Sequence, residues 1–232
     1  MCTVTFLPLQ NDNFILTSNR DEQRIRETLP PKKYEENGVD LFFPKDKIAG
    51  GTWIGASSKK RVVCVLNGAF KKHKRKDYYK KSRGIIAKDL LKASDFPLCV
   101  KNLDLQDIEP FTMIIVDWNN HMNLFELIWD ANKKYFTKLK NKPSIWSSST
   151  LYEDNIKQLR KKWFQNWLAN NEFTSESILS FHHSEIDDKE QAVLMKRSYV
   201  ETVSITSVKK ENETFEMLYE DVVHSKKSAF NF

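Results

Sequence analysis

The stretch that decides the fold is MCTVTFLPLQNDNFILTSNRDE, residues 1–22. Two apolar runs rich in β-branched and aromatic residues flank a turn-forming tetrapeptide, Gln10–Asn13. This pattern predicts a β-hairpin. With the tip in the middle of that tetrapeptide, the numbers of paired residues sum to 23, so Cys2 lies opposite Asp21 on one face of the sheet. A slip of one residue would turn these two side chains to opposite faces.

Cys2 carries the candidate chemistry of this hairpin. We expect Met1 to be removed because the second side chain is small, which leaves a free α-amine and a thiol on one residue. An unperturbed terminal amine has a pKa of about 7.7–8.0 and a thiol about 8.5, so the amine can take the thiol proton near neutral pH. Such a residue is a nucleophile with its own base. The alternative is that Cys2 is an inert residue at the end of the chain.

The composition is that of an ordinary globular protein. Of the 232 residues, 40% are hydrophobic and 12% aromatic, and no linker or internal repeat divides them, so we expect one domain over residues 1–232. Three cysteines without a C-x-x-C pair indicate a reducing compartment. Without a signal-peptide pattern or an apolar run near 18 residues, the protein is expected to be cytoplasmic, with no membrane span.

The rest of the chain predicts an α+β protein. The run Arg61–Leu66 is almost continuously apolar, which predicts burial on both faces of a sheet. Residues 23–37 are expected to form a surface loop, and the tail from His224 to be loose. Two sheets with helices outside them are the favoured layering. Further strands are expected at 52–54, 111–118, 122–129, 134–139, 144–148, 199–208 and 214–219, and helices at 83–91, 151–170 and 174–181.

A cysteine nucleophile that attacks an amide carbonyl needs an oriented base and donors for the oxyanion. Asp21 is the candidate that orients the Cys2 amine, and Asn67, at the end of the buried run, is the candidate oxyanion donor. Losing one such donor typically costs about 100- to 1,000-fold in rate. The alternatives are an ordinary Asn67-Gly68 turn and a surface ion-pair cluster at residues 20–22.

The most basic segment is Lys71–Lys81, which contains two tyrosines. Such runs are usually solvated loops, and binding of nucleic acid or anionic lipid is the less favoured interpretation. A third interpretation is that the segment rims a pocket for an acidic substrate, lined by Trp53 and Phe70, although these two residues are more often core. The His182-His183 pair lacks matching ligands, and the chain has no P-loop, Rossmann or G-x-S-x-G motif, so neither a metal nor a cofactor is expected.

Five motifs occur in the order typical of the NRDE family, also called the transport-and-Golgi-organisation family. The chain resembles this family strongly over residues 1–90, and later only at Thr202-Val203. The family is similar to N-terminal nucleophile (Ntn) hydrolases of the penicillin V acylase and bile salt hydrolase group. The resemblance implies a four-layer αββα sandwich and hydrolysis of a linear amide, with roles for Cys2, Asp21 and Asn67. The motifs are Met1–Thr3, Asn19–Glu22, Gly50–Gly55, Leu66–Asn67 and Ser82–Gly84.

The chain departs from the hydrolase pattern at its arginine. The hydrolases carry an Arg about three residues before the Asp, where this chain has Ser18, and here Arg20 adjoins the Asp instead. In the predicted register Asn19 shares the face of Cys2, whereas Arg20 points away unless a bulge re-aims it. Ser148 stands where the hydrolases have a middle-sheet Asn.

We therefore expect a cysteine amidohydrolase acting on a small acylated substrate. Its catalytic residues would be Cys2, Asp21, Asn67 and Arg20, and Asn19 is a further candidate for substrate contact. The alternative is a non-catalytic binding or trafficking protein of the same fold that handles haem or acyl lipid. That alternative follows from the family resemblance.

Overall fold

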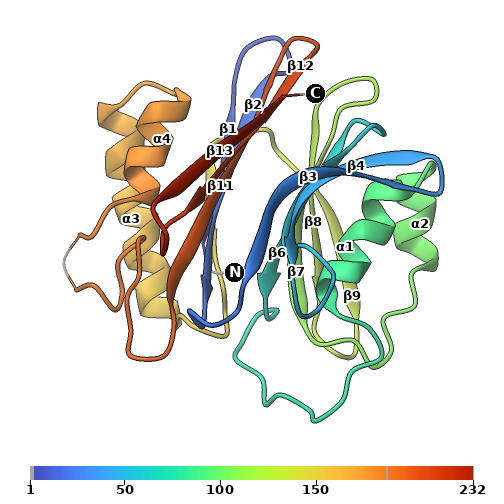
Figure 1. Ribbon diagram of the computed structural model, residues 1–232, viewed down its shortest axis with the longest axis horizontal. Helices are drawn as coiled ribbons and strands as arrows, with labels where there is room; N and C mark the ends of the chain where they lie inside the picture. The colour runs from blue at the N-terminus through green and yellow to red at the C-terminus, as the bar shows by residue number, and fades with distance from the viewer. Residues whose placement is uncertain (1–2, 187, 232) are drawn as a thin grey trace. The chain divides into compact units, whose positions relative to one another are not determined.

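The protein is described by a computed structural model of residues 3–186 and 188–231 (Figure 1). The chain forms two compact units, which we call the terminal unit (residues 1–26 and 142–232) and the central unit (residues 27–141). Each unit is an antiparallel sheet with a pair of helices. Among the described residues, no helix is long and apolar enough to cross a membrane.

The terminal unit has helices on one face of its sheet (Figure 1). Leu7 and Ile15 are paired neighbours on that face, and they pack against aromatic side chains of the helices such as Phe164 and Phe181. Full burial of each such side chain contributes about 1.5–3 kcal/mol. The strand order is β10-β1-β2-β11-β12-β13, with β1 (Thr3–Pro8), β2 (Phe14–Glu22), β10 (Ser144–Ser147), β11 (Glu201–Glu211), β12 (Thr214–Asp221) and β13 (Lys226–Asn231), and the helices are α3 (Asp154–Asn170) and α4 (Ser175–His182).

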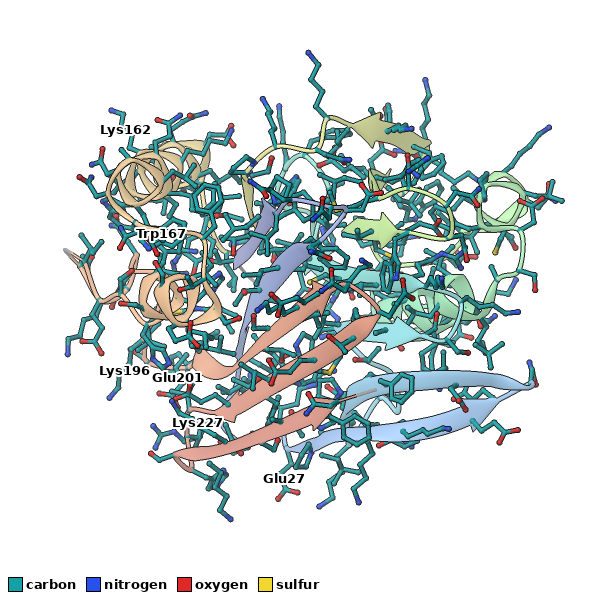
Figure 2. All side chains as sticks on the ribbon, turned by 90° about the horizontal axis from the view of Figure 1, so that it is seen from above. Glu27, Lys162, Trp167, Lys196, Glu201 and Lys227 are labelled. Atoms are coloured by element: carbon teal, nitrogen blue, oxygen red, sulfur yellow. The ribbon has the colours of Figure 1, made fainter. Side chains whose placement is uncertain are left out.

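The two helices of the terminal unit also pack against each other. The Trp167 ring of α3 lies 6.0 Å from the Phe181 ring of α4, while Lys162 lies on the outer side of α3 (Figure 2). Helix α4 begins where predicted, because the Thr174 hydroxyl accepts a hydrogen bond from the Ser177 amide at 3.1 Å. Helix α3 begins three residues later than predicted, so Tyr152 belongs to the preceding loop.

The central unit has the strand order β3-β4-β5-β6-β7-β8-β9. Helix α1 begins at Arg83, and the side chain of Ser82 caps it as predicted by accepting a hydrogen bond from the Ile85 amide. An added Cβ on Gly84 would lie 2.6 Å from the Thr52 carbonyl oxygen, so the glycine lets the start of α1 contact that backbone directly. The strands are β3 (Thr28–Glu36), β4 (Val39–Asp46), β5 (Ile54–Ser57), β6 (Arg61–Asn67), β7 (Phe111–Asp117), β8 (Asn123–Trp129) and β9 (Lys134–Leu139), and the helices are α1 (Arg83–Lys92) and α2 (Phe96–Asn102).

Two predicted irregular segments are strands. The prediction of a loop at residues 23–37 is wrong over Thr28–Glu36, which forms the edge strand β3. Its prolines are tolerated because they lie in the interruption of the ladder between Leu29 and Lys32, at a sheet edge. The prediction of a loose tail from His224 is also wrong, because 226–231 pairs with β12 as strand β13. The predicted burial of β6 on both faces is confirmed.

The hairpin at the start of the chain is confirmed, but its predicted register is wrong. Thr3 pairs with Asn19 and Pro8 with Phe14, so the residue numbers sum to 22. The loop therefore spans residues 9–13, closed by a 2.8 Å hydrogen bond from the Leu9 amide to the Asn13 carbonyl. This odd-length loop puts even-numbered residues of both strands on one face and odd-numbered residues on the other.

Candidate functional site

Asp21 is the best-organised candidate residue in the terminal unit. Its side chain lies near the end of β2 and the residue is only 2% exposed. One carboxylate oxygen accepts the Thr202 hydroxyl at 2.6 Å, and the other accepts the Tyr152 hydroxyl at 3.0 Å. A buried carboxylate needs donors of this kind to offset the loss of hydration.

A β-bulge in the neighbouring strand supplies one of these donors. Ser204 pairs with Arg20 and Thr202 pairs with Asp21, so Val203 is the extra residue. Regular pairing would place Val203 opposite Asp21, and the bulge places a hydroxyl there instead. The sequence allows a bulge near Asn19 that would turn the Arg20 side chain to the other face. The observed bulge lies instead in β11, where it directs the Thr202 side chain toward Asp21.

Two guanidinium groups lie against the Tyr152 ring. The central carbon of Arg160 is 3.7 Å from the ring centroid, and that of Arg197 is 5.2 Å from it. Arg160 is fully buried and donates to the Thr3 hydroxyl at 2.5 Å and to the carbonyls of Gln191 and Ala192. Cation–π contacts of this kind fix the ring and contribute about 1–2 kcal/mol when desolvated.

Asn19 is engaged by the helix layer. Its side-chain nitrogen donates to the carbonyls of Val193 (2.7 Å) and His182 (3.1 Å), and its oxygen lies 2.6 Å from His182 Nδ1. Burial lowers the pKa of His182 to about 3, so the ring is neutral and its Nε2 contacts the Thr5 hydroxyl at 2.7 Å. These contacts give Asn19 a structural role between β2 and the helices, and a substrate contact stays a prediction.

Arg20 lies on the face of the sheet opposite Asn19. It is buried, it pairs with Ser204 across the ladder, and its Nη1 donates to the Arg26 carbonyl at 3.2 Å. Cys2 lies outside the described residues, so its predicted contact with Asp21 stays a prediction. The observed β1–β2 register applies only to the described pairs, of which Thr3 with Asn19 is the first.

The other predicted residues are dispersed over both units. Asn67 ends β6 of the central unit and pairs with Phe111. Trp53 of the same unit is buried, whereas Phe70 is 49% exposed and packs its ring against Tyr135 with a centroid distance of 5.1 Å. Ser148 belongs to the terminal unit, where its hydroxyl lies 2.9 Å from that of Thr150. Their roles toward a substrate stay predictions.

The basic segment Lys71–Lys81 is partly neutralised within the central unit. Three of its lysines lie 3.4–3.6 Å from carboxylates. The segment borders a surface pocket of about 550 Å³, whose wall includes His73, Lys74 and Trp129. Neither Trp53 nor Phe70 is among the described residues that line this pocket. In the described part of the chain, no three His, Cys, Asp or Glu side chains are grouped to hold a metal ion.

Sequence reasoning missed Tyr152 and the contact of Thr202 with Asp21. Tyr152 stood at the start of a predicted helix, and Thr202 was noted only for its resemblance to the family. The signal that could have found Tyr152 is the run of small polar residues at 147–150, which is a poor helix start and leaves the next aromatic residue in a loop.

Among the solved structures with the same fold are several hydrolases. Conjugated bile acid hydrolase from Clostridium perfringens matches with a TM-score of 0.57 at 10% identity, over 99% of this chain and 92% of that chain. An N-acylethanolamine-hydrolyzing acid amidase ortholog from Caenorhabditis elegans matches at 0.54 and 10%, over all of both chains. Penicillin V acylase from Agrobacterium tumefaciens matches at 0.53 and 9%, over 100% of this chain and 86% of that chain.

These likenesses establish an Ntn-hydrolase-like α+β fold, as the sequence predicted, and at such identities they establish the fold alone. No curated protein matches the chain. The model of the family described as Transport and Golgi organisation 2 (TANGO2) matches residues 1–227. The chain therefore belongs to the Transport and Golgi organisation 2 family.

Proposed function

We propose that this protein is an N-terminal cysteine hydrolase that cleaves the linear amide C–N bond of a small acylated substrate. The observation that carries the proposal is the end of the β1–β2 hairpin. Thr3 pairs with Asn19 at this end of the hairpin, and Arg20 and Asp21 follow Asn19 in β2. The buried, hydroxyl-bonded carboxylate of Asp21 follows directly.

In this proposal the positive charge of Arg20 would favour the thiolate form of Cys2. Asp21 would hold the α-amine of Cys2. By family resemblance, Asn67 and a backbone N–H would stabilise the oxyanion.

The proposed reaction has two balanced steps. The Cys2 amine takes the thiol proton, the thiolate sulfur bonds to the carbonyl carbon, and the C–N bond breaks as the leaving nitrogen receives that proton. Water then attacks the thioester with the amine again as base. The C–S bond breaks, the acid is released, and the thiol is restored.

Two measurements test this proposal. Intact mass must show loss of Met1, since a retained methionine would block the proposed base. N-acyl amino acids, acyl-homoserine lactones and penicillin V are then screened as substrates. We expect Cys2→Ser to lower turnover by on the order of 10⁴-fold or more. The matched control is Cys99→Ser, because the half-buried Cys99 thiol has its pKa raised by burial. Equal activity of wild type and Cys2→Ser would refute the mechanism.

The second candidate function is ligand binding without catalysis, and the central-unit pocket favours it. Its volume of about 550 Å³ lies within the usual range for small-molecule sites, about 300–1,000 Å³. The wall combines the Trp129 and Tyr79 rings with Lys74, which suits an acyl or ring-shaped body with an acidic group. We propose haem or an acyl lipid as the ligand class.

Titration of the Cys2→Ala variant separates the two functions. Binding of haem or acyl-CoA by this variant, together with no cleavage by wild type, would favour the binding role. Lys74→Glu should then weaken binding, whereas Lys162→Glu on the outer side of α3 should not. Covalent labelling of Cys2 by an amide substrate would favour the hydrolase.

A further inference from the structure

We propose that Tyr152 and Thr202 are positioning residues that act through Asp21 on the N-terminal cysteine. This inference rests on the proposed hydrolase function. Each hydroxyl bonds a different oxygen of the Asp21 carboxylate, at 3.0 Å from Tyr152 and 2.6 Å from Thr202. With both oxygens held, the carboxylate plane is fixed about its last side-chain torsion.

The Thr202 donor has no freedom to turn away. Its oxygen accepts the Met195 amide at 3.0 Å, and the Thr202 amide donates back to the Met195 carbonyl at 2.8 Å. A threonine hydroxyl has one proton to donate, so this proton points at Asp21. The β11 bulge at Val203 sets this orientation, which a regular strand would not provide.

The Tyr152 donor is fixed by its ring. Arg160 lies against the ring from α3, and Arg197 approaches it from the segment before β11. The Arg197 guanidinium is itself held by the carbonyls of Glu190 and Leu151. Two elements of the terminal unit therefore hold one hydroxyl against Asp21, and side chains locked in this way are what a site needs in its supporting shell.

Two positive charges lie against the Tyr152 ring that donates to Asp21, those of Arg160 and Arg197. Arg20 precedes Asp21 in β2, with its side chain on the other face of the sheet. Within the described residues, the Arg160 guanidinium donates to hydroxyl and carbonyl oxygens and forms no ion pair with a carboxylate. The nearby acids, Glu22 and Glu201, are paired with Arg26 and Arg24.

The two donated hydrogen bonds therefore partly neutralise the negative charge of the Asp21 carboxylate. Without one of them, the carboxylate would exert a stronger negative field on the N-terminal residue, and a stronger negative field holds protons more tightly on its amine and thiol. Loss of either hydroxyl should raise the pH at which the Cys2 thiol becomes reactive.

The experiment measures iodoacetamide alkylation of Cys2 against pH, followed on the N-terminal peptide by mass spectrometry. We expect the midpoint to rise by about half to one pH unit in Tyr152→Phe and in Thr202→Val. Thr202→Ser keeps the hydroxyl and should restore the wild-type midpoint. Tyr199→Phe, at a tyrosine 85% exposed in the same unit, should leave it unchanged.

A structural role alone would lower thermal stability without moving the midpoint. Unchanged midpoints in folded Tyr152→Phe and Thr202→Val would overturn the inference. Should Tyr152→Phe fail to fold, the Val and Ser variants of Thr202 decide the matter by themselves. Intact mass separates this result from the proposed function, because a retained Met1 refutes the hydrolase mechanism whatever the midpoints are.

Discussion

The two units attach their helices to their sheets in different ways. In the central unit, the start of α1 contacts the backbone of the β4–β5 connection at Gly84. Carbonyls at the C-terminal end of α1 accept hydrogen bonds from Arg61, whose charge is paired with Asp117 at 2.9 Å. In the terminal unit, the helices send polar side chains to the sheet: Arg160 reaches Thr3. His182 reaches Thr5 and Asn19 in the same way.

The difference matters because the strands reached in the terminal unit carry the candidate site. Thr3 follows Cys2 directly, and Asn19 precedes Arg20 and Asp21. A change in the helix layer is therefore transmitted to these strands through hydrogen bonds. The corresponding contacts of the central unit serve packing and charge compensation.

Replacing the two buried arginines is the strongest test of this comparison. Arg61→Leu and Arg160→Leu should each lower the free energy of unfolding by about 3–5 kcal/mol, because each leaves buried polar partners unpaired. Only Arg160→Leu should also raise the Cys2 alkylation midpoint, since it removes a positive charge next to Tyr152. Urea unfolding and the alkylation profile check the two effects. A midpoint shift in Arg61→Leu would break the comparison.

The backbone contact of the central unit predicts the next largest effect. In Gly84→Ala the new methyl group would lie 2.6–2.7 Å from the Thr52 backbone, so α1 must move. We expect a loss of about 2–3 kcal/mol in unfolding free energy with no change at Cys2. Gly38→Ala is the control, since it meets no atom within 4 Å and carries only the strain of its positive φ of 72°, about 1 kcal/mol. Equal losses would argue against the close approach.

His182 makes the stability of the terminal unit depend on pH. Its pKa is about 3 in the folded state because of burial, against an ordinary value of 6.5. Between these values the unfolded chain binds the extra proton, so stability present above pH 6.5 is lost as the pH falls toward 3, with a slope of at most about 1.4 kcal/mol per pH unit. His182→Gln should flatten this slope, whereas His73→Gln in the central unit should keep it. Urea midpoints measured from pH 7 to 4 decide the question.

Local patterns predicted much of the fold but not its pairings. The hairpin, the buried run at β6 and the Ser82 cap each depend on neighbouring residues, and all three are present. The register was missed by one step because a two-residue tip and a loop over 9–13 suit the same turn-forming residues. Both faces of β1 and β2 are buried, so burial alone does not choose between the two registers. The observed pairing of Leu7 with Ile15 brings both side chains against α3 and α4, which lie far along the chain.

The sequence predicted which residues belong to the candidate site better than it predicted their contacts. Asp21 could be named from its signature, but its partners lie 131 and 181 positions away. No periodicity encodes the extra residue at Val203, because a bulge changes the face of one strand against another without altering the alternation nearby. Asn19 is the opposite case: it stands in the signature, yet its side chain bonds His182 of α4 and the Val193 carbonyl.

The smallest expected loss of stability is that of Phe70→Ala. This variant tests whether an exposed aromatic side chain of the central unit serves packing or function. Its ring is half exposed and touches Tyr135 edge-on, so Phe70→Ala should lower the unfolding free energy by only about 0.5–1 kcal/mol. Tyr78→Ala, at another exposed aromatic residue, is the matched control. A KM for an amide substrate that rises several-fold in Phe70→Ala at unchanged kcat, but not in Tyr78→Ala, would show that the ring contacts substrate. Equal KM values would assign it to the surface alone, because an exposed ring with one aromatic neighbour has little else to contribute.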